Sequence, residues 1–157
     1  MILGWGEKKL GIAAPLHGRI MDIIAVPDPV FGEKMLGDGF AVEPSPEENT
    51  VVAPCDGEVV LVADTKHAVA LRAQGVEMLI HVGLDTAVLG GEGFQALVRS
   101  GDQVSAGTPL LSFDRDILQA KGKSLVTVLV VTNEAEAVKK IAKDFTQPSA
   151  ALTVTVK

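Results

Sequence analysis

The sequence contains few cysteine and aromatic residues, and each shortage excludes a class of protein. Its 157 residues include one cysteine, Cys55. A single thiol excludes an internal disulfide and is typical of a protein from a reducing compartment. Aromatic residues make up 4% of the chain, whereas hydrophobic residues make up 47%. We therefore expect a sizeable core that is built mainly of aliphatic side chains.

Basic residues and long apolar runs are also scarce. The 14 lysines and arginines are outnumbered by 20 acidic residues, which gives a formal net charge of −6. No basic cluster offsets this balance, so it argues against a nucleic-acid-binding protein. No apolar run approaches the roughly 20 residues that a membrane span needs, and residues 1–10 lack a signal-peptide core. We therefore expect a soluble, cytoplasmic protein.

Glycine and proline, in contrast, occur along the whole chain. The 16 glycines and 8 prolines separate short runs of valine, isoleucine and leucine. This pattern is typical of an all-β sandwich or barrel with many tight turns. The length fits one domain. We predict a short N-terminal tail at residues 1–10, followed by a single domain at residues 11–157.

A short pattern occurs twice and indicates an internal duplication. Residues 14–20 and 53–59 both have the form A-P-x-x-G-x-[I/V], in which proline and glycine favour a tight turn into a strand. Two copies predict duplicated β-hairpin units in an antiparallel β-sandwich. Residues 101–104 and 107–111 suggest a third strand pair. We interpret His17, inside the first copy, as a turn residue.

A few short helices are predicted between the strands. Residues 28–37 favour a helix because Asp28 suits its N-cap and Gly37 its C-cap. Residues 114–121 favour a second helix, with Asp114 as its cap. One or two helical turns are expected within residues 134–143. Two further strands are expected, a buried one at 125–132 and a final one at 152–156.

Two of the three histidines lie on what we predict to be neighbouring antiparallel strands. Residues 65–71 and 76–82 are rich in strand-forming side chains. A three-residue loop, Ala73 to Gly75, joins them, with Gly75 in its left-handed position. The resulting register puts His67 directly opposite His81, with Cβ atoms roughly 4.5–5.5 Å apart.

Thr65 lies two residues before His67 and therefore on the same predicted face. A facing imidazole pair allows three interpretations: a solvated strand face, a zinc site, or a site of nucleophilic catalysis. Two ligands are too few for a stable structural zinc site, and the chain has no HxH motif to supply more. In the catalytic interpretation one neutral imidazole attacks while the other stabilises charge. The Thr65 hydroxyl could fix the tautomer of His67.

Other residues near this pattern allow both a structural and a functional interpretation. Asp85, four residues after His81, could be a turn carboxylate, could orient an imidazole, or could pair with a partner's arginine. Phe31 could pack in the core or serve as an exposed docking residue. The glycines of residues 90–93 are too irregularly spaced for a nucleotide-binding loop.

Taken together, the motifs resemble one known family over nearly the whole chain, from residue 13 to residue 156. The chain is similar to the glucose-type enzyme IIA domains of the bacterial phosphoenolpyruvate-dependent sugar phosphotransferase system. The resemblance rests on the order and spacing of these motifs: A-P-x-x-G at 14–18, P-D-x-V-F at 27–31, G-D-G at 37–39, A-P-x-D-G at 53–57, T-x-H-A at 65–68, I-H-V-G-L-D-T at 80–86, G-E-G-F at 91–94, and D-x-x-x-L-x-x-K-x-K-S-L-x-T at 114–127.

The resemblance implies an antiparallel β-sandwich and a phosphotransferase role. Such domains accept a phosphoryl group from the histidine phosphocarrier protein and pass it to a cysteine of a sugar-specific enzyme IIB, and so serve the membrane enzyme IIC indirectly. The phosphorylated histidine of the family matches His81, and its supporting histidine matches His67. Thr65 matches the threonine that bonds the supporting histidine. Several sugars are served by domains of this type, so the sugar stays open.

The resemblance also assigns supporting residues. Asp28 and Asp85 match the aspartates that flank the site, and backbone amides around Gly83 could add donors to a phosphoryl group. An apolar docking rim is expected to contain Val30, Phe31, Leu79 and Val82. Val82 departs from the family because a phenylalanine often follows the active histidine, and the hairpin is one residue shorter than usual.

The resemblance implies no required cofactor, although the histidine pair could bind zinc. A lysostaphin-type zinc peptidase is the main competing class, since Asp85 follows His81 with HxxxD spacing, but the HxH motif is missing. A lipoyl- or biotinyl-type carrier would need a lysine at a hairpin tip with an acidic or methionine neighbour, which is not found. A regulatory module that binds further targets according to its phosphorylation state is compatible with the phosphocarrier hypothesis.

Overall fold

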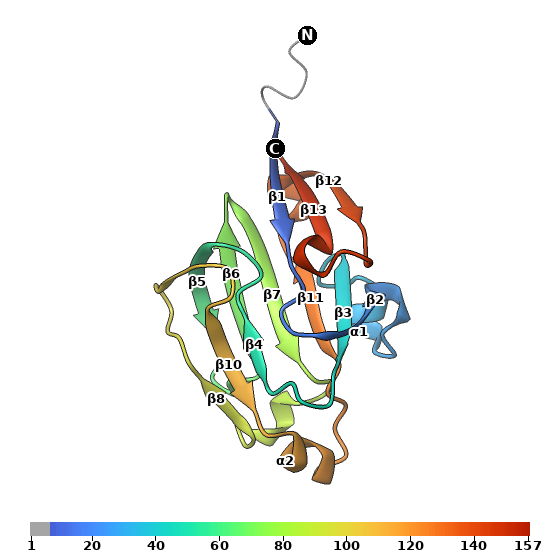
Figure 1. Cartoon of the computed structure of the whole chain (residues 1–157), viewed down its shortest axis with the longest axis vertical. Helices are drawn as coiled ribbons and strands as arrows, with labels where there is room; N and C mark the ends of the chain where they lie inside the picture. Colours follow the sequence, from blue (N-terminus) through green and yellow to red (C-terminus); the bar gives the residue numbers. More distant parts are fainter. Residues whose placement is uncertain (1–6) are drawn as a thin grey trace.

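The computed structural model describes residues 7–157 as three antiparallel sheets joined by turns and short helices (Figure 1). The large sheet has the order β2 (Gly18–Asp22), β3 (Gly39–Pro44), β11 (Thr127–Val131), β7 (Val76–Val82), β6 (Ala68–Ala73), β5 (Gly57–Val62), β9 (Gln103–Val104). The small sheets are β1 (Lys8–Ile12), β13 (Leu152–Val156), β12 (Val138–Lys143), and β4 (Thr50–Val52), β10 (Pro109–Phe113), β8 (Phe94–Ala96). The predicted antiparallel β-sandwich is confirmed.

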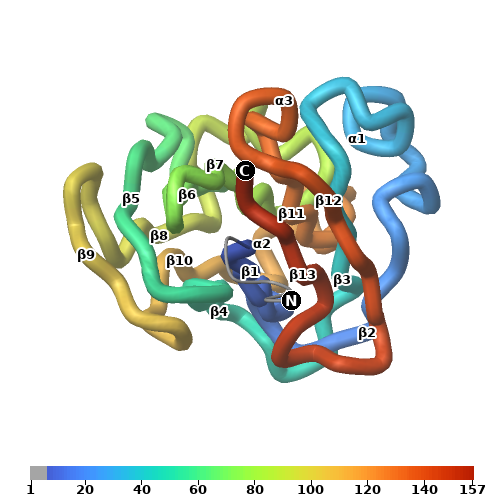
Figure 2. Tube along the Cα trace, turned by 90° about the horizontal axis from the view of Figure 1, so that it is seen from above, coloured from blue at the N-terminus to red at the C-terminus, as the bar shows by residue number. Residues whose placement is uncertain are grey.

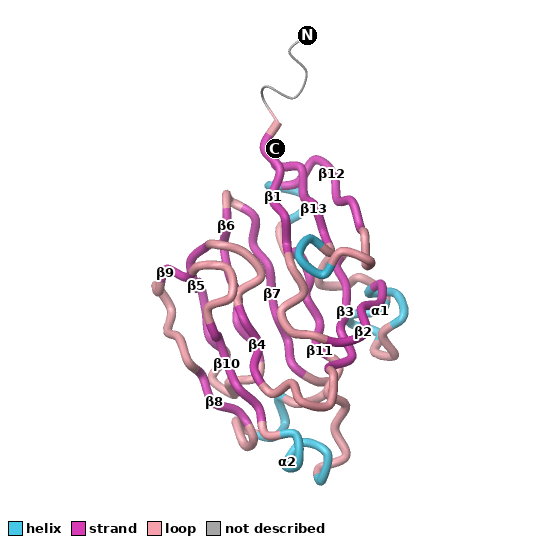
Figure 3. The backbone as a smooth tube through the Cα atoms, viewed as in Figure 1, coloured by secondary structure: helices cyan, strands magenta, loops and turns pink. Residues whose placement is uncertain are grey.

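Helices are short and lie outside the sheets (Figure 3). The α-helices are α1 (Pro29–Gly32), α2 (Arg115–Ala120) and α3 (Glu134–Ala137), and the 3-10 helices are η1 (Ile23–Ala25), η2 (Ala87–Leu89) and η3 (Pro148–Ala150). The Asp28 carboxylate caps α1 and the Asp114 carboxylate caps α2, as the sequence predicts. Within residues 7–157 no helix is long and apolar enough to cross a membrane.

The large sheet has two faces with different coverings. Seen from above, it runs across the molecule from β9 to β2 (Figure 2). One face packs against both small sheets around an aliphatic core. The opposite face carries a smaller cluster, in which side chains from β3 and β11 pack against η1 and α1: Ile23, Val26, Phe31, Ala41, Val128 and Val130. The second cluster brings α1 onto the face that holds the functional site.

The alternation of side chains along β7 decides which residues face which layer. Met78 and Ile80 are fully buried in the sandwich core, whereas Leu79 and His81 face the other way and are only partly buried. In β11 all residues are buried because the sheet is covered on both faces there. Residue 81 therefore lies on the α1 side of the sheet.

The duplicated turns pack against each other as a pseudo-symmetric pair. The Ala13 amide donates to the Pro54 carbonyl at 3.0 Å, and the Val52 amide donates to the Pro15 carbonyl at 2.8 Å. These are equivalent positions in the two copies, and each copy leads into a strand, β2 or β5. His17 lies in the first turn, exposed, with its Nδ1 3.0 Å from Glu48 Oε1, so its interpretation as a turn residue is confirmed.

Several predicted boundaries are wrong, and each has a local cause. The first predicted helix ends at Gly32 rather than Gly37 because Lys34 takes a left-handed backbone conformation, with φ 59°. Within residues 134–143 the expected helical turn is present as α3, and the rest of the segment forms β12, which the sequence did not predict. The suggested strand pair at 101–111 does not form, since β9 pairs with β5 and β10 pairs with β4 and β8.

The predicted tail at residues 1–10 overlaps the first strand, which begins at Lys8. Residues 1–6 lie outside the described part of the chain. From Lys8 onward the chain forms β1, which pairs with β13, and Leu10 is buried in the core.

The side chain of Cys55 is also buried, and this burial raises the pKa of its thiol to about 11, so it is protonated and packs as a small apolar residue.

Close approach of β3 and β11 makes Gly39 a test of this packing. A Cβ atom there would lie 1.9 Å from the Leu129 carbonyl oxygen, which is backbone and cannot move aside. We expect Gly39→Ala to lower the free energy of unfolding by about 3 kcal/mol or more, because the two strands must separate. Urea denaturation would measure this loss.

Gly11→Ala is the matched control in a strand. Its Cβ would meet only Ala150 Cβ, at 3.9 Å, in ordinary contact. Since alanine reduces the entropy of the unfolded chain, this variant should gain about 0.5 kcal/mol. Equal losses in both variants would contradict the predicted close packing of β3 and β11.

Candidate functional site

The hairpin that carries the histidines differs from the predicted one by a single residue. Gln74 and Gly75 both have positive φ, at 50° and 80°, which defines a two-residue turn of the type that matches strand twist. The register pairs Arg72 with Glu77 and Ala68 with His81. The predicted three-residue loop and the direct pairing of His67 with His81 are therefore wrong.

The two imidazoles nevertheless meet. His67 lies one residue before β6, in a tight turn where Lys66 has φ 58° and the Ala63 amide donates to the Ala68 carbonyl. Because His67 stands outside the strand, the alternation rule does not fix the direction of its side chain. Its ring centroid lies 4.6 Å from that of His81, edge to face at 82°.

Two phenylalanines extend this pair into a row of four rings. Phe31 from α1 lies 4.9 Å from His81, and Phe94 from β8 lies 6.3 Å from His67, measured between ring centroids. Phe31 is only 5% exposed, so it is not the exposed docking residue that was one of two sequence interpretations. It packs against His81 instead. The sequence does not predict the contact of Phe94 with His67, although the G-E-G-F motif at 91–94 contains this residue.

The carbonyl of Gly83 determines which nitrogen of His81 carries the proton. His81 Nδ1 lies 2.9 Å from this oxygen. A carbonyl can only accept, so Nδ1 must donate its hydrogen and the lone pair must reside on Nε2. His81 therefore presents Nε2 as its nucleophilic atom.

Gly83 is required by the loop that follows β7. Its φ is +80°, and a Cβ there would lie 2.4 Å from Thr86 Cγ2 and 2.7 Å from the Ser124 carbonyl oxygen. Its amide already donates to the Val126 carbonyl at 2.8 Å, so among the backbone amides around Gly83 this one is not free to bind a phosphoryl group. The buried Thr86 hydroxyl donates to the Val82 carbonyl at 2.6 Å and closes the turn.

Thr65 and His67 are in direct contact, as expected from their spacing. Thr65 Oγ1 lies 2.7 Å from His67 Nδ1. If the hydroxyl donates, the proton of a neutral His67 is on Nε2. The left-handed Lys66 between them costs about 1–2 kcal/mol in a residue with a side chain, and backbone strain of this kind is common at functional sites.

Burial keeps both imidazoles neutral. Burial and, second, the neighbouring His67 lower the pKa of His81 to about 4, against smaller raising effects from the Gly83 carbonyl and from Asp28. Burial also lowers the pKa of His67. Near neutral pH both rings are therefore uncharged, and the His81 lone pair is available for attack.

The two flanking aspartates occupy different surroundings. Asp28 Oδ1 accepts from the Val30 amide at 2.9 Å and from the Phe31 amide at 3.4 Å, so it fixes the start of α1 beside His81. Asp85, with φ 58°, bonds Lys123 Nζ through Oδ2 at 3.1 Å. Asp85 therefore orients a lysine, which the sequence analysis did not predict.

The apolar rim differs in part from the predicted one. Val82 is fully buried in the sandwich core, so it cannot contact a partner. Val30 is 40% exposed, and Leu79 is partly buried. Further exposed apolar side chains occur in the segments before and after α1 and in η2: Ile24, Met35, Leu36 and Val88.

The described residues contain no cluster of three or more His, Cys, Asp or Glu that could hold a metal ion. His67 and His81 could supply two imidazole ligands. A zinc ion there would therefore need further ligands from a second molecule or from solvent.

Known proteins show a consistent likeness to this chain. Residues 10–137 match the family described as phosphoenolpyruvate-dependent sugar phosphotransferase system, EIIA 1. The chain is 49% identical over 143 residues to a glucose-specific EIIA component from Bacillus cereus, covering 88% of this chain and 86% of that protein. It is 45% identical over 128 residues to one from Staphylococcus epidermidis, covering 81% and 76%. The solved structure of glucose permease IIA from Mycoplasma capricolum matches with a TM-score of 0.79 and 35% identity, covering 93% and 96% of the two chains.

The depressed pKa of His81 predicts a pH-dependent stability. Between pH 6.5 and about 4, His81 of the unfolded chain binds a proton that His81 of the folded chain does not. The stability that neutral His81 contributes is therefore fully present above this range and is lost as the pH falls through it. The loss is about 3 kcal/mol at most. Urea denaturation from pH 7 to pH 4.5 should show a shallower decline for His81→Gln than for the wild-type protein. Equal declines would contradict a buried, neutral His81.

Proposed function

The chain belongs to the EIIA 1 family of the phosphoenolpyruvate-dependent sugar phosphotransferase system, and from this premise we propose that His81 carries the phosphoryl group. Family membership supports a phosphotransfer role in sugar uptake. The single observation that carries the assignment is the bond between His81 Nδ1 and the Gly83 carbonyl, at 2.9 Å. This bond leaves a neutral Nε2 as the attacking atom.

The proposed donor is the phosphohistidine of the histidine phosphocarrier protein. The His81 Nε2 lone pair attacks phosphorus in line, the new N–P bond forms, and the N–P bond of the donor breaks with its electron pair returning to the donor imidazole. Such a transition state needs positioning and charge stabilisation more than covalent assistance. The group then passes to a cysteine of a sugar-specific enzyme IIB, which serves the membrane enzyme IIC.

His67 is proposed to stabilise charge on the phosphoryl oxygens. Its ring lies 4.6 Å from that of His81 between centroids. With Thr65 donating to Nδ1, the Nε2–H of a neutral His67 is free to donate to an oxygen of the phosphoryl group. Because this donor is already oriented, little reorganisation is needed when the group arrives.

The surface around His81 supports transient docking of a protein partner. Exposed apolar residues such as Val30 would exclude water from the N–P bond when a partner binds. Asp28 and Asp85 add negative charge at this rim, and a partner's arginine could replace Lys123 as the counterion of Asp85. We place this exchange in the cytoplasm, where the donor protein acts.

No metal takes part in this proposed transfer. The proposal also keeps His67 and His81 as two ligands for a zinc ion whose coordination a partner would complete. Regulatory targets would bind the same surface according to its phosphorylation state. The HxxxD spacing that suggested a zinc peptidase has no matching contact in the structure, since the Asp85 carboxylate bonds Lys123.

Site-directed phosphorylation tests the proposal. Wild-type protein incubated with phosphoenolpyruvate, enzyme I and the histidine phosphocarrier protein should gain one acid-labile phosphoryl group by intact mass. His81→Gln should gain none, because it lacks the nucleophile. His67→Gln should still accept the group but pass it to enzyme IIB more slowly, by about 100-fold for a loss of about 2.7 kcal/mol.

His17→Gln is the control, since this exposed histidine lies in a turn outside the site. It should behave as the wild type. Phosphorylation of the His81→Gln variant under the same conditions would contradict the assignment of His81.

Thr65 is expected to act through the orientation of His67. Thr65→Val keeps the shape of the side chain but removes the hydroxyl, so His67 can rotate and change tautomer. Phosphorylation of His81 should persist, while transfer to enzyme IIB slows by about tenfold. Thr65→Ser retains a hydroxyl and should restore most of the rate. Equal rates for the valine variant and the wild type, measured by single-turnover transfer, would show that the Thr65–His67 bond has no role.

A further inference from the structure

The segment that covers His81 leaves the large sheet and returns to it at one point. Residues 23–37, here called the covering segment, begin after β2 ends at Asp22 and finish one residue before Asp38, where the chain turns back into β3. Asp22 and Phe40 are partners across the β2–β3 ladder. Two aspartates therefore stand at the two ends of the covering segment, on neighbouring strands.

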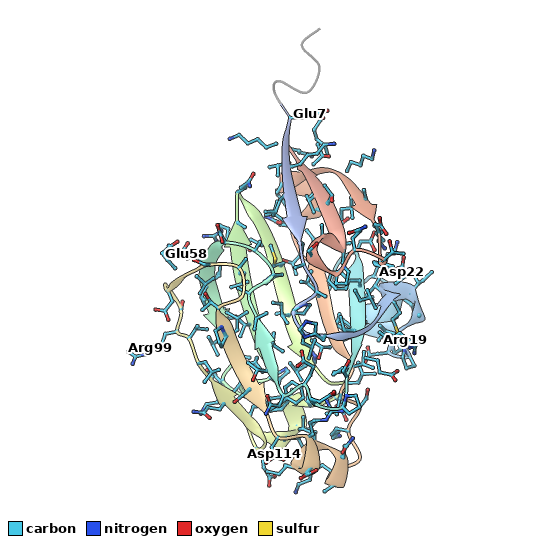
Figure 4. The ribbon with its side chains drawn as sticks, in the orientation of Figure 1. Glu7, Arg19, Asp22, Glu58, Arg99 and Asp114 are labelled. Carbon is cyan, nitrogen blue, oxygen red and sulfur yellow. The ribbon has the colours of Figure 1, made fainter. Side chains whose placement is uncertain are left out.

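A single lysine bonds both aspartates. Lys143 Nζ donates to Asp22 Oδ1 at 3.0 Å and Oδ2 at 3.1 Å, and to Asp38 Oδ1 at 2.6 Å. Lys143 is the last residue of β12, which belongs to a different sheet. Figure 4 labels Asp22 on the flank of the molecule where the covering segment leaves the sheet. The contact thus ties both ends of the segment to the C-terminal part of the fold.

This cluster differs from an ordinary surface ion pair. The side chains of Lys143 and Asp38 are 20% and 19% exposed. Burial opposes ionisation of both groups, but the hydrogen bonds between them prevail, so the pKa of Asp38 is lowered and that of Lys143 is raised. Removing the lysine would leave two carboxylates at the ends of the covering segment. Among residues 7–157, Lys34, 3.6 Å from Asp38 Oδ1, is then the one cation that pairs with either of them. Loss of one partner from a partly buried pair is costly.

The covering segment carries most of what surrounds His81 on this face. Phe31 packs on the His81 ring and Asp28 lies beside it. Of the large apolar side chains that are exposed among residues 7–157, four lie in this segment or its helix: Ile24, Val30, Met35 and Leu36. Whatever fixes the segment therefore also fixes Phe31 against His81 and the exposed apolar side chains that the segment carries.

We propose that Lys143 is a positioning residue for phosphoryl exchange: by bonding Asp22 and Asp38 together, it holds the covering segment in the position that a phosphoryl-exchanging protein partner recognises. The inference rests on the proposed function for its kinetic consequence. Lys143 touches neither the imidazoles nor the phosphoryl group, so it acts through the covering segment alone. Its removal should weaken partner binding more than the chemical step.

Hydrogen–deuterium exchange of the free protein tests the clamp without any assumption about function. Lys143→Gln should raise amide exchange across residues 23–37 by at least about tenfold, and leave β6 and β7 within about twofold of the wild type. Lys140→Gln, an exposed lysine on the same strand, is the matched control and should change neither region. Uniform acceleration, or no change in the covering segment, would overturn the proposal.

A second variant keeps the test decisive if Lys143→Gln does not fold. Asp38→Asn retains the acceptor for the Gly39 amide and leaves the Lys143–Asp22 pair intact. In this variant amide exchange should rise in the same residues as in Lys143→Gln, but by a smaller factor. Lys143→Arg keeps the charge and both acceptors within reach, and should restore protection. The proposal would be overturned if Asp38→Asn did not raise exchange in the covering segment and Lys143→Arg did not restore its protection.

Transfer kinetics then test the consequence for function, with the phosphorylated histidine phosphocarrier protein as donor. We expect Lys143→Gln to raise KM for this donor about tenfold, with kcat within about twofold of the wild type, and Lys143→Arg to recover the wild-type KM. An unchanged KM would overturn the positioning role. If the wild-type protein accepts no phosphoryl group at all, the proposed function fails, whereas the exchange result still decides whether Lys143 clamps the segment.

Discussion

The hydrogen bond from His81 Nδ1 to the Gly83 carbonyl is the interaction on which the rest of the site depends. It occupies Nδ1 and so leaves the lone pair on Nε2, and it requires the chain to turn back immediately after β7. That turn requires glycine at residue 83, because φ is positive there and because Thr86 and Ser124 leave no room for a Cβ atom. The end of β7, the glycine at residue 83 and the tautomer of His81 therefore depend on one another. The proposed nucleophile is set by backbone geometry before any partner arrives.

Burial of the two imidazoles imposes a second condition, since a neutral ring in apolar surroundings must still satisfy its polar atoms. Each ring does so locally, His81 through a carbonyl and His67 through the Thr65 hydroxyl. No buried side-chain nitrogen or oxygen in residues 7–157 lacks a hydrogen-bond partner. Because the Nδ1 atoms are occupied, the Nε2 atoms are the ones left for chemistry. The aromatic neighbours Phe31 and Phe94 supply low polarity without competing hydrogen bonds.

Sequence patterns predicted the fold class and the contact between the two histidines, but the strand register that was expected to bring them together is wrong. The β-sandwich follows from short aliphatic runs between glycines and prolines, and the last strand, 152–156, was predicted to the residue. The hairpin was misjudged because Gln74, which does not favour a positive φ, adopts one and shortens the turn. The histidines still meet because His67 lies in a turn where strand alternation does not apply. Lys143 could not have been found from local patterns, since its partners lie 121 and 105 residues away.

The site must satisfy two opposing demands, because a buried imidazole stays neutral and nucleophilic, yet Nε2 must be open to a protein partner. The covering segment separates these demands in space. Its inner side, with Phe31, packs on the sheet and desolvates His81, while its outer side presents apolar residues to solvent. The position of the segment therefore depends on this packing and on how its two ends are held. Lys143 fixes those ends by bonding two carboxylates. Because it does not contact the imidazoles, its charge does not compete with them for the phosphoryl group.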